Sequence, residues 1–140
     1  MFKAFAKMIL SFTLVSALTI SSVSAASKSV KIKITYVNAE LVENNHVGNE
    51  WATSGIINNK EILEGDSIIL DMKSTDSIKI KAKASELDKI PDSGSGSTSI
   101  KVSAITKKTT KTLKVTVKEN RGRYSGNTAE WKFIFEISKL

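Results

Sequence analysis

The feature that most constrains this chain is an alternation of apolar and polar residues with a period of two. It recurs in six separate runs, at residues 30–36, 68–72, 78–84, 100–104, 113–117 and 131–137. Because successive side chains of a β-strand point to opposite faces, each run predicts a strand with one buried and one solvent-facing side. A seventh or eighth strand is expected between Glu50 and Leu63, and the sequence has no amphipathic helical period of useful length.

Turn signals separate these runs and indicate the fold class. They contain Asn, Gly, Asp or Pro and lie at residues 44–45, 48–49, 58–59, 65–66, 91–94, 122 and 126–127. Short strands at this spacing favour two packed antiparallel sheets. The sequence therefore predicts an all-β fold, an antiparallel two-sheet β-sandwich of about seven to eight strands. The repetitive segment Ser93–Ser99 is predicted to be a flexible loop.

The first 25 residues have the three-part layout of a cleavable secretory signal peptide. Lys3 and Lys7 provide the basic start, an uncharged apolar run follows at residues 9–20, and Val23 and Ala25 occupy the positions that signal peptidase reads. The apolar run is shorter than the roughly 20 residues of a membrane-spanning helix, and an uncleaved membrane anchor is the alternative. We therefore expect a signal peptide at 1–25, a single β-sandwich domain at 26–140 and a secreted product without a membrane span.

The numbers of cysteine and histidine residues limit the kinds of site that the chain can form, because it has no cysteine and one histidine. The first count excludes a disulfide scaffold and thiolate catalysis, and the second excludes a multi-histidine metal centre. His46 lies in a turn rich in Asn and Gly, and the sequence has no Gly-x-Ser-x-Gly motif. We therefore expect no enzymatic activity, with a small secreted hydrolase that uses His46 as an alternative.

An acidic loop, Ser85–Gly94, contains the first candidate site. It follows an alternating strand and places Glu86, Asp88 and Asp92 within seven positions. Calcium takes six to eight oxygen ligands, several of them carboxylates, and residues leaving a strand end can converge on one ion. The loop therefore predicts a calcium site, and a solvated polar turn shaped by Pro91 and Gly94 is the alternative.

The same loop resembles the third calcium-binding loop of the calcium-dependent phospholipid-binding sandwich family, typified by protein kinase C and synaptotagmin. Glu86, Asp88, Asp92 and Gly94 match the acids and the glycine of that loop. The stretch 36–51 is loosely similar to the family's first loop, with asparagines where the family uses aspartates. The resemblance implies an eight-strand sandwich that binds calcium and its partner through the loops at one end.

A lysine-rich face is the second candidate site. The chain carries a formal net charge of +7, and Lys79, Lys81 and Lys83 project from one side of a predicted strand. Further lysines occupy similar positions on other strands or cluster in a predicted turn: Lys31, Lys33, Lys101, Lys114 and Lys118 on strands, and Lys107, Lys108 and Lys111 in the turn. Such a surface attracts polyanions. The alternative is that lysine is the ordinary solvent-facing residue of an alternating strand.

A Gly-rich hairpin before the last strand is the third candidate site. It presents Arg121, Arg123 and Tyr124, residue types that often anchor binding partners. A turn whose tyrosine packs on the rim of the sandwich is the alternative. The partners expected for both basic sites are an anionic cell-wall polymer, lipid headgroups or another extracellular protein. Nucleic acid is disfavoured because few aromatic residues lie among the lysines to stack on bases.

Together these patterns favour a small secreted, non-enzymatic β-sandwich binding protein that acts at the cell surface or outside the cell with the assistance of calcium. Its binding site is expected at one end of the sandwich, in the loops near Glu86–Asp92 and Arg121–Tyr124. A secreted structural or matrix protein, or a toxin-neutralising protein, without ion dependence is the alternative from another class. Such a protein would act through an edge strand or a sheet face.

The signal peptide generates the first testable prediction. We expect the exported chain to begin at Ala26 or one residue later, because small residues precede this position directly after the apolar run. Mass spectrometry of the culture medium measures the mature mass. A full-length mass in the membrane fraction would contradict the prediction.

Overall fold

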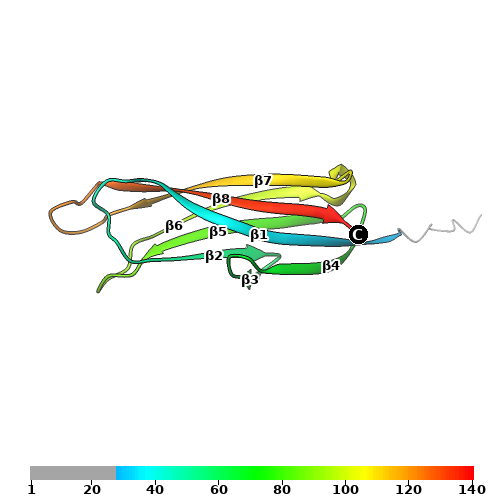
Figure 1. Ribbon diagram of the computed structural model, residues 1–140, viewed down its shortest axis with the longest axis horizontal. Coiled ribbons are helices and arrows are strands. Elements are labelled where there is room, and N and C mark those ends of the chain that lie inside the picture. The colour runs from blue at the N-terminus through cyan, green and yellow to red at the C-terminus, as the bar shows by residue number, and fades with distance from the viewer. Residues whose placement is uncertain (1–27) are drawn as a thin grey trace, which may run out of the picture.

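The protein folds into a sandwich of two antiparallel sheets. The computed structural model describes residues 28–140, and the predicted signal peptide at 1–25 lies outside them. Eight strands form in chain order, followed in Figure 1 from cyan to red: β1 (Ser29–Asn44), β2 (Trp51–Ile57), β3 (Lys60–Ile62), β4 (Ser67–Lys73), β5 (Ser77–Glu86), β6 (Ser93–Lys101), β7 (Lys108–Lys118) and β8 (Thr128–Lys139). The all-β, two-sheet prediction is confirmed.

The strands divide equally between the sheets. Sheet A has the order β4-β1-β8-β7 and sheet B the order β3-β2-β5-β6, and every pairing is antiparallel. The chain crosses from one sheet to the other after β1, β3, β4 and β6. As a result, β7 is an edge strand of sheet A and β6 is an edge strand of sheet B. Residues 28–140 contain no helix that could span a bilayer.

The apolar side of each alternating run fills the space between the sheets. Tyr36, Phe133 and Phe135 are fully buried at its centre, and the tyrosine ring stacks on both phenylalanines at centroid distances of 5.7 and 5.1 Å. The Tyr36 hydroxyl donates a hydrogen bond to Oγ1 of Thr53 across the sandwich, at 3.0 Å. Gly55 makes room for these rings, since a Cβ there would lie 2.8 Å from Phe135.

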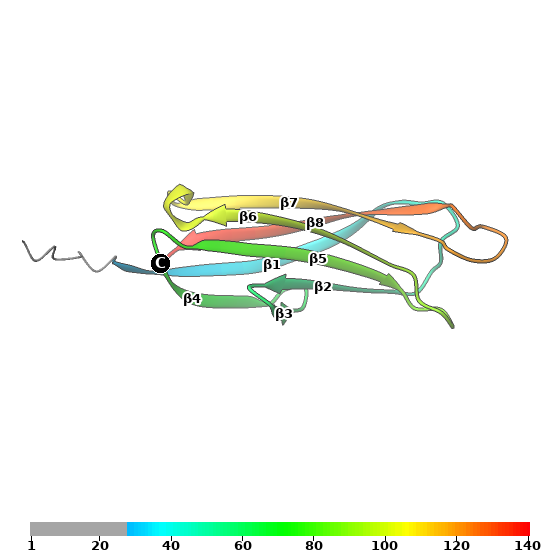
Figure 2. The ribbon, with the colours of Figure 1, turned by 180° about the vertical axis from the view of Figure 1, so that it is seen from behind.

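The prediction of a flexible loop at Ser93–Ser99 is wrong, because this segment forms most of β6. Its glycines face inward against the backbone of β7: a Cβ on Gly94 would lie 2.1 Å from the carbonyl oxygen of Thr116, and one on Gly96 would lie 2.7 Å from that of Lys114. We call this close approach the β6–β7 seam, and Figure 2 shows the two strands side by side. The composition suggests flexibility, but the glycines are there because no side chain fits.

Three further predictions about element boundaries are wrong. Residues 102–104, expected to continue a strand, form a 3-10 turn. Lys108 and Lys111, expected in a turn, lie in β7, where threonines with high strand propensity surround them. The stretch compared with a first binding loop is mostly strand, because β1 continues to Asn44 through two register shifts that follow Tyr36 and Leu41.

Three connections gather at one end of the sandwich, which we call the loop end. They are the β1–β2 loop (45–50), the β5–β6 loop (87–92) and the β7–β8 loop (119–127), seen at the left of Figure 1. The start of β1 and the C-terminal residue lie at the opposite end of the sandwich. The fold therefore brings together loops that are far apart in sequence.

The seam generates a prediction about stability. Gly94→Ala should lower the free energy of unfolding by about 1–3 kcal/mol, because the new methyl group meets a backbone oxygen that cannot move aside freely. The expected fall in the melting temperature is about 4–12 °C for a domain of this size. Ser95→Ala is the matched control, since its side chain is exposed on the same strand. Equal melting temperatures for the two variants would contradict the seam.

Candidate functional site

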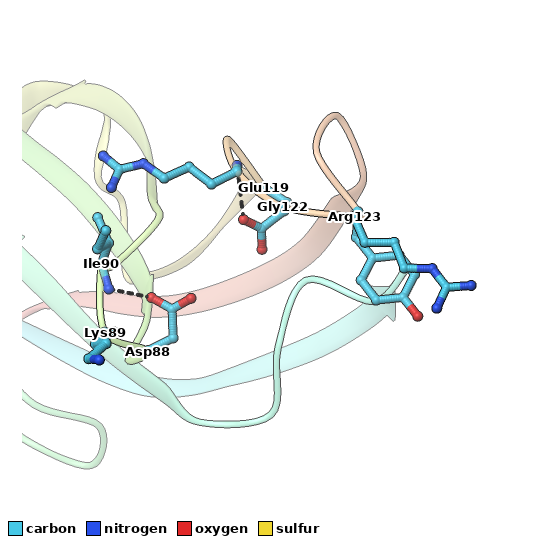
Figure 3. Close-up of a pocket in the computed structure, with 8 residues that line it drawn as sticks. Asp88, Lys89, Ile90, Glu119, Gly122 and Arg123 are labelled. Carbon is cyan, nitrogen blue, oxygen red and sulfur yellow. Dashed lines mark hydrogen bonds between the residues drawn. The ribbon is translucent and has the colours of Figure 1, made fainter.

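The β5–β6 and β7–β8 loops face each other across an open cleft of about 310 Å³. Figure 3 shows residues of the first loop on one side and residues of the second on the other. Cationic, acidic and apolar side chains share this cleft, whose lining consists of Asp88, Lys89, Ile90, Glu119, Arg121, Gly122, Arg123 and Tyr124. The cleft is the place where the sequence-predicted residues Asp88, Arg121, Arg123 and Tyr124 meet.

Carboxylates shape the β5–β6 loop by accepting hydrogen bonds from its own backbone. The carboxylate of Glu86 accepts from the backbone N–H of Asp88 at 3.1 Å, and the carboxylate of Asp88 accepts from that of Ile90 at 2.8 Å. The backbone N–H of Leu87 donates to the carbonyl of Glu50 at 2.8 Å, which ties the loop to the β1–β2 loop. The result is a short turn that presents Leu87 and Ile90 to solvent, 48% and 49% exposed.

Glu86 is a buried carboxylate, only 4% exposed, at the end of β5. Gly48 of the β1–β2 loop covers it so closely that a Cβ on that glycine would overlap the glutamate side chain. Burial raises the pKa of Glu86, and the nearby charges of Asp88 and Glu119 raise it further, against the hydrogen bond from the backbone of Asp88. The charged form of Glu86 is therefore less favourable in the folded protein than in the unfolded chain.

Asp92 is also buried, 7% exposed, but its surroundings favour the charged form. Its carboxylate accepts a 2.6 Å hydrogen bond from the side-chain amide of Asn120 and a 3.3 Å bond from the Asn120 backbone. Burial alone would raise the pKa of Asp92, but the bonds from Asn120, a hydrogen bond with Glu119 and the charge of Arg121 together lower it. Asp92 and Asn120 thus fasten the β5–β6 loop to the β7–β8 loop.

The β7–β8 loop is held by its own hydrogen bonds and by an aromatic stack. The carboxylate of Glu119 accepts from the backbone N–H of Arg121 at 3.1 Å, and its carbonyl accepts from that of Gly126 at 2.8 Å. The ring of Tyr124 stacks on His46 of the β1–β2 loop at 4.9 Å, and the guanidinium carbon of Arg123 lies 5.7 Å from the centre of the tyrosine ring. All three loops are therefore connected by direct contacts.

The acidic residues assigned to calcium do not form a metal cradle in the part of the chain that the structure describes. Among residues 28–140, no group of three or more His, Asp or Glu side chains is placed to hold a metal ion. Glu86 and Asp92 direct their carboxylates to protein donors, and Asp88 is exposed. The residues do not fit the six or more oxygen ligands that calcium requires. Calcium binding stays a prediction of the sequence.

The structure brings together some of the sequence-predicted residues and separates others. Asp88, Arg121, Arg123 and Tyr124 line one cleft, so the acidic loop and the hairpin lie at the same end of the sandwich, as the sequence predicts. The strand lysines, Lys79, Lys81 and Lys83, lie instead on the outer face of sheet B.

Sequence reasoning missed Glu119 and Asn120, which organise the cleft. The sequence pattern does mark Glu119, because it lies two residues after Val117 and so on the same inward-facing side as Leu113, Val115 and Val117. Glu86 likewise lies on the inward-facing side of β5. An acid in phase with a buried face is expected to point inward. No comparable pattern marks Asn120, whose partner lies 28 positions away.

The chain matches no known protein-family model, and no curated protein resembles it significantly. The loop-end geometry and the charge distribution are therefore the basis for a functional proposal.

The two buried acids generate a paired prediction with opposite signs. Glu86→Gln should raise the melting temperature at neutral pH, because it removes a charge that burial disfavours while it keeps an acceptor. A raised folded pKa penalises the wild type above that pKa, so the gain should vanish as acid protonates Glu86.

Asp92→Asn should instead lower the free energy of unfolding by about 1–2 kcal/mol at neutral pH, because it removes charge-assisted hydrogen bonds to Asn120. A lowered folded pKa contributes stability above the unfolded pKa that is lost in acid, so this deficit should also shrink as pH falls. Melting curves from neutral pH to pH 3 measure both differences. A shift of the same sign in the two variants would contradict the assignment.

Proposed function

We propose that the protein is an exported, non-enzymatic binding module whose loop end docks on anionic lipid headgroups at the cell surface. One observation carries the proposal: cationic and exposed apolar side chains occur together on two neighbouring loops. Lys89, Arg121 and Arg123 are exposed around the cleft. Leu87, Ile90 and Tyr124 are exposed on the same loops, and the tyrosine is 42% accessible.

This mixture of side chains suits the boundary between water and lipid. Transfer of aliphatic side chains from water to the region between headgroups and acyl chains lowers the free energy. Tyrosine is favoured at that depth because one end of its ring is apolar and the other polar. Each Lys or Arg near an anionic membrane surface contributes about 1 kcal/mol, and a guanidinium can hold a phosphate with two parallel hydrogen bonds.

The connected loops favour docking as one unit. The Asp92–Asn120 bond and the stack of His46 on Tyr124 hold the three loops in one arrangement. A preordered site loses less side-chain and loop entropy on binding than a flexible one. Glu86, Asp92 and Glu119 are buried at the loop end, whereas Asp88 is exposed in the cleft beside the cations. Burial of three acids leaves Lys89, Arg121 and Arg123 as the larger share of the exposed charge around the cleft.

Vesicle binding tests the proposal. The protein should co-sediment with vesicles of 30% phosphatidylglycerol in phosphatidylcholine, in the presence of a calcium chelator, and should bind pure phosphatidylcholine vesicles weakly. The double variant Arg121→Gln, Arg123→Gln should bind at least about tenfold more weakly, since it removes two cations from the docking surface. Ile90→Ser should weaken binding at all salt concentrations, because its contribution is apolar.

Lys108→Gln with Lys114→Gln is the matched control, because it removes the same charge from the outer face of sheet A. Equal weakening by the control and by the arginine variant would contradict docking through the loop end. Absence of binding to anionic vesicles would also contradict it, and binding that appears only with added calcium would support the calcium prediction from the sequence.

A further inference from the structure

The outer face of sheet B carries a row of lysines beside a row of serines. Lys79, Lys81 and Lys83 of β5 are exposed, and β6 places Ser99, Ser97 and Ser95 directly opposite them in the antiparallel register. We call these six residues the lysine–serine face. It lies apart from the cleft of the loop end, with which it shares no lining residue.

Four lysines on the outer face of sheet A form ion pairs, whereas no lysine that the structure describes on the outer face of sheet B does so. All four ion pairs within residues 28–140 join strands of sheet A: Lys31–Asp71, Lys108–Glu136, Lys114–Glu130 and Lys132–Glu40. On sheet B, the neighbours opposite Lys81 are Ser97 and Ile56, and those opposite Lys83 are Ser95 and Ser54. No carboxylate of the described chain lies within ion-pair distance of these lysines.

Protection of a sheet edge does not account for this row of charges. Lysines discourage edge-to-edge pairing when they lie on an edge strand, but β5 lies between β2 and β6. Like charges placed along one strand repel each other and stabilise nothing within the sheet. A strand at the centre of a face, bearing unpaired cations at every second position, is instead a suitable surface for an external anion.

The geometry of the face indicates what kind of anion fits. Alternate residues of a strand are separated by roughly 6.6–6.8 Å, so the lysines form a straight line of evenly spaced charges. Each lysine has a serine across the register, and the pair can meet the two free oxygens of one phosphodiester. Hollows of about 170 and 200 Å³ flank the row; Lys79, Lys81 and Ser97 line the first, and Lys83 with the acidic Glu61 lines the second.

We infer that the lysine–serine face is a second binding surface, for a linear polymer of phosphodiesters that carries no bases. The outward-facing residues of this face include no aromatic side chain on which a base could stack, which sets the polymer apart from single-stranded nucleic acid. The polymer lies along β5 and exchanges its counterions for the lysine ammonium groups. Its affinity therefore depends on salt through the number of lysines engaged.

Binding of a poly(glycerol phosphate) oligomer, measured by calorimetry at several salt concentrations, tests the inference. The triple variant Lys79→Gln, Lys81→Gln, Lys83→Gln should bind about tenfold or more weakly. The slope of its log Kd against log salt should fall by about 2, as three lost contacts predict. The control variant Lys108→Gln, Lys114→Gln, Lys132→Gln removes equal charge from ion-paired lysines and should keep the wild-type slope.

If the two triple variants weaken binding equally, net charge alone explains the effect and the inference is overturned. Absence of binding by the wild-type protein would also overturn it. Polyglutamate and oligothymidylate of matched charge should bind more weakly than the glycerol phosphate oligomer, and equal binding of either would overturn the phosphodiester assignment. The Arg121→Gln, Arg123→Gln variant should bind the oligomer normally, so this test and the vesicle test can fail separately. If the β5 triple variant does not melt cooperatively, the single variant Lys81→Gln replaces it, and its affinity for the oligomer is compared with that of the wild type.

Discussion

The structure depends on the close approach of β6 to β7 at the seam between the two sheets. Gly94 and Gly96 allow the backbones to come together where any Cβ would collide with a carbonyl oxygen. The seam continues past the strand ends into the bond between Asp92 and Asn120. Because β6 begins where the β5–β6 loop ends, and β7 ends where the β7–β8 loop begins, the seam also brings together the two loops that line the cleft.

The carboxylates of the loop end serve mainly as internal hydrogen-bond acceptors. Glu86, Asp88 and Glu119 each accept from a backbone N–H two residues further along the chain, which shapes the turns. Asp92 is different, because its bonds with Asn120 join two separate loops. These hydrogen bonds, accepted by the buried acids Glu86, Asp92 and Glu119 and by the exposed Asp88, hold the loops that carry the exposed cations and apolar side chains. The docking proposal requires such a fixed arrangement.

Period-two patterning was sufficient to predict the class of fold, since burial of one strand face is a local property that the sequence records directly. It also placed Glu86 and Asp92 in one loop and Arg121 in another. The sequence predicted that those loops share one binding end, but it did not predict the contacts between them, such as the bond of Asp92 with Asn120, because these depend on which sheet edges become neighbours. For the same reason the sequence around the glycines of β6 predicted a flexible loop, although the close approach of a distant strand, at Thr116, explains these glycines.

The placement of the chain ends has a consequence for how this molecule can be presented. The start of β1 and the C-terminus lie together, a full strand length from the three loops (Figure 1). A tether attached to Leu140 would therefore hold every copy with its loops pointing away from the support. The lysine–serine face runs parallel to the strands and would therefore lie on the side of each tethered molecule. Neighbouring molecules at high surface density would block access to this face before they blocked access to the loop end.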